Sequence, residues 1–105
     1  MSKLPDQYLS IKKRFSKFFT AAKNLGKVAS TAGPINAKTA QLIKLAAAAA
    51  IRSEGSVHSH AKRALDAGAK PDEIYHALIL TTSIIGFPTV SAALSWADDV
   101  IMKKE

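Results

Sequence analysis

The chain of 105 residues is long enough for one domain with a single hydrophobic core. Its apolar content of 48% and charged content of 22% are typical of a folded globular protein and exclude an intrinsically disordered chain. The sequence contains no cysteine, which excludes disulfides, a thiolate nucleophile and a cysteine-ligated metal site.

The hydrophobic segments do not indicate a membrane protein. The chain opens on a charged segment, so we expect no secretory signal and a cytoplasmic location. The longest apolar run, residues 77–90, is too short to span a bilayer and is interrupted by Gly86 and Pro88. We therefore expect no transmembrane helix and no membrane partner.

The net charge of +7 is concentrated near the N-terminus. Residues 1–27 contain seven basic residues and one acidic residue, a net charge of +6, whereas the remainder carries +1. A basic run of this kind is usually a solvated helix face, but it could also contact an anionic partner. Because no recognised nucleic-acid-binding motif accompanies it, nucleic acid is not the expected partner.

The first predicted element is an amphipathic helix over residues 6–25. Its apolar positions follow the spacing i, i+4, i+7, i+8 and i+11, and they are Ile11, Phe15, Phe18, Phe19 and Ala22. We interpret the three phenylalanines as core anchors. Gly26 is predicted to end the helix, and residues 27–35 are predicted to form a loop.

The second predicted helix, residues 37–52, is apolar on nearly every side and contains five consecutive alanines. A helix without a polar face must be surrounded by other elements or by another subunit. Asn36 is placed to cap its N-terminus. Gly55 predicts a break, after which a third helix follows over residues 56–67, with Ser53 or Ser56 as its cap.

Two further helices are predicted over residues 71–86 and 87–103. Pro71 suits the first turn of the former, which ends at Gly86. No run of alternating polar and apolar residues indicates a strand, so the fold class is all-α, a bundle of about five helices in one domain. This much apolar helix surface predicts a homo-oligomer, from dimer to hexamer, that assembles through the central helices.

The order of motifs from the second to the fifth helix resembles the carboxymuconolactone decarboxylase family, which includes the alkylhydroperoxidase D-like proteins. The motifs are Ser53-x-x-Ser56-x-x-x-His60, residues 64–78 from Ala-Leu-x-Ala-Gly-Ala-x-Pro onward, and Gly86-Phe87-Pro88. The resemblance covers residues 38–97 and implies an all-α, alkylhydroperoxidase D-like fold that oligomerises.

The resemblance also implies which positions correspond to the peroxidase site. The two cysteines of that site correspond to Ser53 and Ser56, its histidine to His60, and its glutamate to Gln41. A serine hydroxyl forms neither an accessible thiolate nor a disulfide, and glutamine cannot relay a proton. We therefore expect no thiol peroxidase activity, whereas the lactone decarboxylases of the family, which lack the cysteine pair, leave lyase chemistry open.

His60 is the central candidate for catalysis, together with Ser56 one helical turn before it and Ser53. Gln41, Glu54 and His58 are candidate ligand-binding residues. An alternative role for His60 is to satisfy polar groups at the turn between two helices. A serine hydrolase pair of Ser56 and His60 is disfavoured, because it would need a third group to orient the base and an oxyanion hole, and only Glu54 is nearby in the sequence.

We expect no metal and no cofactor. Glu54 and His58 share a helix face at i, i+4, but His58 and His60 face different sides, so three metal ligands do not converge within this segment.

Two functions remain open. The first is a binding site for a small carboxylated or lactone-like ligand, with lyase or isomerase activity. The second is a non-catalytic oligomeric scaffold or binding protein that contacts an anionic partner through its basic first helix.

Overall fold

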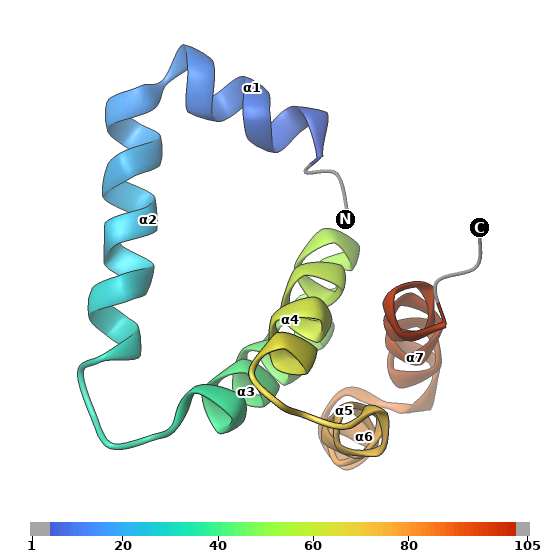
Figure 1. Ribbon diagram of the computed structural model, residues 1–105. Helices are drawn as coiled ribbons and strands as arrows, with labels where there is room; N and C mark the ends of the chain where they lie inside the picture. Colours follow the sequence, from blue (N-terminus) through green and yellow to red (C-terminus); the bar gives the residue numbers. More distant parts are fainter. Residues whose placement is uncertain (1–4, 103–105) are drawn as a thin grey trace. The chain divides into compact units, whose positions relative to one another are not determined.

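The computed structural model describes residues 5–102, and every regular element among them is an α-helix, which confirms the predicted fold class. Figure 1 labels the helices along the chain. They are α1 (Asp6–Arg14), α2 (Ser16–Ser30), α3 (Ala37–Ala50), α4 (Glu54–Asp66), α5 (Pro71–Ile79), α6 (Thr82–Ile85) and α7 (Phe87–Ile101). There are seven rather than about five because two predicted helices are each interrupted. Lys3 of the basic segment and Lys103 of the last predicted helix lie outside the described residues.

The chain divides into two compact units, Met1–Pro34 and Ile35–Glu105. The first unit contains α1 and α2, separated at Phe15, which has non-helical backbone angles (φ −131°, ψ 58°). The predicted stop at Gly26 is wrong, because α2 continues to Ser30. A lone glycine lowers helix stability by only about 1 kcal/mol relative to alanine, which neighbouring helix formers can offset.

The interpretation of the phenylalanines as core anchors is also wrong. Phe15 and Phe18 are 51% and 67% exposed, and neither α1 nor α2 has a buried residue. Phe19 is partly buried and packs edge-on against Tyr8, with 5.0 Å between ring centroids. Two helices of this length cannot enclose a core between them, so the apolar stripe of the first unit stays exposed.

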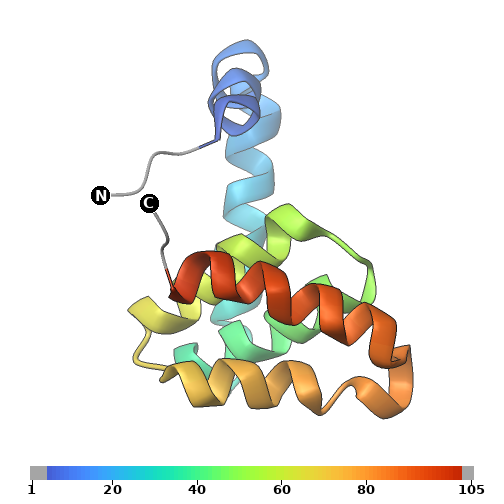
Figure 2. The ribbon, with the colours of Figure 1, turned by 90° about the vertical axis from the view of Figure 1, so that its right-hand side faces the viewer.

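The second unit encloses the core. In it, α3 packs on α4 and α5, and α7 packs on α4 and α5. Figure 2 shows α7 running back beside α5 and α6. The largest fully buried side chains are Leu45, Val57, Ile74, Leu78 and Val90. Alanines fill much of the remaining core and let neighbouring helices approach closely, and the fully buried ones are Ala49, Ala61, Ala64, Ala93 and Ala97.

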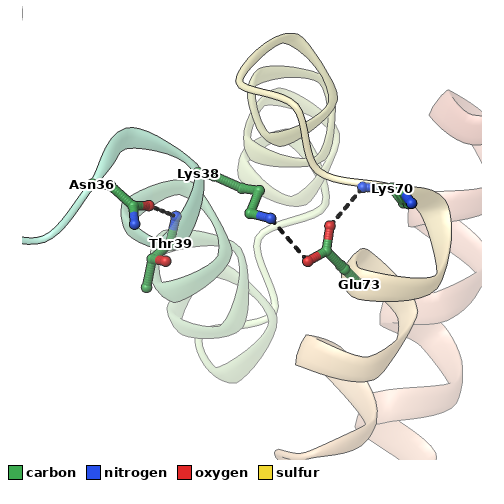
Figure 3. Close-up of polar contacts among 5 residues, drawn as sticks. All are labelled: Asn36, Lys38, Thr39, Lys70 and Glu73. Atoms are coloured by element: carbon green, nitrogen blue, oxygen red, sulfur yellow. Dashed lines mark hydrogen bonds and ion pairs between the residues drawn. The ribbon is translucent and has the colours of Figure 1, made fainter.

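The first turns of α3 and α5 are joined by polar contacts (Figure 3). The Asn36 side chain accepts a hydrogen bond of 2.8 Å from the Thr39 backbone N–H, which confirms the predicted cap. Glu73 accepts one hydrogen bond from the Lys70 backbone N–H at 2.9 Å and another from Lys38 Nζ at 3.0 Å. These hydrogen bonds lower the pKa of Glu73, the contact from the Lys70 backbone contributing most.

The break between α3 and α4 falls at Arg52, not at Gly55 as predicted. Arg52 has a positive φ of 56°, and its N–H and that of Ser53 donate to the carbonyls of Ala49 and Ala48. This pattern is a Schellman motif, which usually places glycine at the left-handed position. The Arg52 guanidinium donates a 2.7 Å hydrogen bond to the Thr89 hydroxyl on α7, which helps hold the turn. Gly55 lies inside the first turn of α4.

The predicted helix over residues 71–86 is interrupted after Ile79. The hydroxyls of Thr81 and Thr82 donate 2.6 Å hydrogen bonds to the carbonyls of Leu78 and Ile79. Such local bonds compete with the helical backbone pattern and favour a break. Gly86, at φ 89°, then makes the turn into α7. No helix among residues 5–102 is long and apolar enough to cross a membrane.

We expect Asn36→Ala to lower the free energy of unfolding by about 0.5 to 2 kcal/mol, because it leaves the N–H of Thr39 without its cap. Urea denaturation followed by circular dichroism measures this loss. Asn36→Asp is the control, since aspartate caps equally well. An alanine variant as stable as the parent would show that the cap contributes nothing.

Candidate functional site

The structure brings His60 and Gln41 together. His60 lies on α4 and Gln41 on α3, and His60 Nδ1 lies 2.8 Å from Gln41 Oε1. The two side chains are nineteen positions apart in the chain, and the α3–α4 turn makes them neighbours. Both are partly buried, so this pair lies at the edge of the core and not inside it.

The surroundings of His60 favour its neutral form. Partial burial lowers the pKa of His60 from its ordinary value of 6.5, and the positive charges of Arg63 and Lys44 lower it further. With Gln41 Oε1 as the acceptor, Nδ1 carries the ring proton and Nε2 holds the lone pair. Near neutral pH, His60 is therefore an uncharged base flanked by two cations.

Ser53 and Ser56 contact each other at the N-terminus of α4. The Ser53 hydroxyl accepts a hydrogen bond of 3.3 Å from the Ser56 backbone N–H, so Ser53 is the N-cap of α4, one of the two predicted choices. This bond fixes the first turn of the helix that carries His60. Ser56 is partly buried and lies one turn before His60 on α4.

Glu54 and His58 form a second group with a residue that the sequence analysis did not single out. His58 Nε2 lies 3.0 Å from Asp99 Oδ2 on α7 and 3.9 Å from Glu54 Oε2. The side chain of His60 contacts α3 and that of His58 contacts α7. This agrees with their spacing of two positions, which places them on different faces of α4. Asp99 was missed because it is 41 positions from His58, and no local pattern links them.

The described residues form an all-α bundle in which His60 on α4 contacts Gln41 on α3. The sequence model of the carboxymuconolactone decarboxylase family matches residues 16–99. The chain therefore belongs to the carboxymuconolactone decarboxylase family. The match starts in α2, well before the resemblance recognised over residues 38–97, so the first unit contributes to the family region. No curated protein gave a significant match.

We expect Gln41→Glu to raise the pKa of His60. A carboxylate within about 3 Å favours the imidazolium, whereas the glutamine amide carries no charge. Titration of the histidine ring resonances by NMR measures the change. The resonances of His58 and His76 serve as internal references in the same spectra, because neither side chain is bonded to Gln41. An unchanged His60 titration would show that the two side chains are not in contact in solution.

Proposed function

We propose that the site around Gln41 and His60 binds a small carboxylated or lactone-like ligand and carries out lyase or isomerase chemistry on it. The observation that carries this proposal is the contact of His60 Nδ1 with Gln41 Oε1 at 2.8 Å. Burial and the positive charges of Arg63 and Lys44 lower the pKa of His60 and so favour its neutral form. Two cations around an uncharged base favour an anionic ligand, and they do so without consuming the lone pair of the base.

The proposed chemistry is proton transfer. Loss of carbon dioxide leaves a carbanion that must be protonated, and isomerisation of a double bond moves a proton between two carbons. Both reactions need a group that takes up and releases a proton near neutral pH, and a partly buried histidine suits this task. Gln41 would hold the ring orientation through Nδ1, which leaves Nε2 of His60 for the ligand. A thiol peroxidase reaction is not available to a chain without cysteine.

A thermal-shift screen with carboxylated lactones and small dicarboxylates tests this function. A ligand present at about 100 times its dissociation constant should add about 2.7 kcal/mol to the free energy of unfolding. The shift should disappear in His60→Ala and persist in Asp66→Asn, a control that removes an exposed carboxylate from the end of α4. A ligand that stabilises the parent and His60→Ala equally would reject this site. Any ligand that stabilises the parent but not His60→Ala is then assayed for carbon dioxide release and for isomerisation.

A second candidate is a non-catalytic oligomeric scaffold that contacts an anionic partner. One observation favours it: the basic residues of α1 and α2 are all exposed, on helices without a buried residue. In the same screen, a short DNA duplex would stabilise such a protein in a salt-dependent way. The effect should weaken when Lys12, Lys13 and Lys17 are changed to glutamine, and should not depend on His60.

Self-association is supported by an apolar hollow on the second unit. It has a volume of about 430 Å³ and is lined mainly by apolar side chains of α3, α5 and α6. Three large residues at this hollow, Ile43, Leu80 and Ile84, are 51%, 65% and 82% exposed. An uncovered apolar surface of this kind marks an interface in a soluble chain, and we propose a second copy as its occupant.

We expect the parent chain to sediment as a dimer or larger oligomer and Ile84→Glu to sediment as a smaller species, because a charge at the hollow resists burial. Sedimentation velocity measures both. Ile51→Glu is the control, since Ile51 is 75% exposed but does not line the hollow. A monomeric parent, or an unchanged mass in Ile84→Glu, would contradict this interface.

A further inference from the structure

A cluster of three metal-binding side chains lies on the side of α4 that packs against α7. Glu54 and His58 come from α4, one turn apart, and Asp99 comes from α7. One ligand atom from each residue can be chosen so that all three lie within 4.8 Å of one another. This cluster is separate from the Gln41–His60 pair, which joins α4 to α3.

The distances suit a single small cation. Zinc binds imidazole nitrogen at about 2.0 to 2.1 Å and carboxylate oxygen at about 2.0 to 2.2 Å, usually in tetrahedral geometry. Two ligands of one tetrahedral ion are then about 3.4 Å apart. The distances from His58 Nε2 to the two carboxylates, 3.0 Å and 3.9 Å, lie on either side of that value. The Glu54 and Asp99 oxygens lie within 4.8 Å of each other, so side-chain rotation would bring all three ligand atoms to one ion.

Without a metal ion, His58 hydrogen-bonds to only one of the two carboxylates of the cluster. His58 Nε2 has one position for a hydrogen, and Asp99 Oδ2 occupies it at 3.0 Å. Glu54 Oε2, at 3.9 Å from the same nitrogen, is beyond hydrogen-bonding distance and lies close to a second negative carboxylate. A divalent cation between the three side chains would neutralise both carboxylates and bind His58 Nε2 in place of its hydrogen, with the ring hydrogen then on Nδ1.

We propose that Glu54, His58 and Asp99 bind a divalent transition-metal ion, with Zn²⁺ as the best match to one imidazole and two carboxylates. All three side chains are partly exposed, so an ion can enter from solvent. Three protein ligands leave a fourth position open for water or a ligand.

Calorimetric titration of Zn²⁺ into the full chain, freed of any affinity tag and treated with chelator, tests the site. We expect one ion per chain. Asp99→Asn and His58→Ala should each weaken binding at least tenfold, since even an outer-shell partner of a metal ligand is typically worth 10- to 100-fold in affinity. Substitution of Co²⁺ should give the visible absorption of a tetrahedral site, which Asp99→Asn should abolish.

Matched controls separate this site from general binding by surface groups. Asp66→Asn removes an exposed carboxylate elsewhere on α4 and should bind Zn²⁺ as the parent does. His60→Ala should also bind normally, because His60 faces α3. Circular dichroism checks that each variant is folded. The absence of binding in the parent, or an equal loss in Asp66→Asn and Asp99→Asn, would overturn the proposal.

Discussion

The close packing of α4 against α3 is the interaction on which the rest of the structure depends. Leu45 and Ala49 on α3, and Val57, Ala61 and Ala64 on α4, are completely buried in one cluster. Alanine at these positions lets the helix backbones approach, and the buried apolar area stabilises the pair without any specific bond. Every other helix of the core is arranged around this hairpin, since α5 packs on α3 and α7 packs on α4.

The same hairpin decides which polar side chains meet. α4 lies between two partners, so residues two positions apart on it reach different helices. His60 contacts Gln41 on α3, and His58 contacts Asp99 on α7. The tight connection between α3 and α4 places Arg52 in the left-handed backbone conformation, at a position where glycine is usual. Its hydrogen bond to Thr89 ties this turn to the beginning of α7.

The surroundings of His60 follow from its neighbours on α3 and α4. The Ser53 hydroxyl accepts from the Ser56 backbone N–H and caps the helix that carries His60. With glutamine at position 41, the partner of His60 is neutral, so no carboxylate raises the pKa of the imidazole, and burial together with Arg63 and Lys44 lowers it. These surroundings favour the uncharged imidazole, and our proposal that the site takes an acidic ligand rests on them.

The sequence by itself determined the helical class, the family and the local signals. Periodicity and the lack of alternating segments predicted the helices, and Asn36 and Ser53 were recognised as caps because capping depends only on neighbouring residues. The resemblance to the family suggested Gln41 and His60 as candidate site residues, and the structure shows that their side chains are in contact. The positions of the helix breaks were harder to predict from the sequence. Arg52, Thr81 and Thr82 form side-chain hydrogen bonds at these breaks, and helix propensity does not reveal such bonds.

Only the tertiary structure decided which side chains meet across helices and which stay exposed. Asp99 joined Glu54 and His58 because α7 packs on α4, a contact between distant parts of the chain that no local spacing encodes. The phenylalanines of the first unit show the converse. Their spacing predicted one apolar stripe on a single helix, but that helix is interrupted at Phe15, and the two short helices provide no partner surface for burial. Hydrophobic periodicity indicates which residues share one face of a helix, whereas tertiary packing determines whether that face is buried.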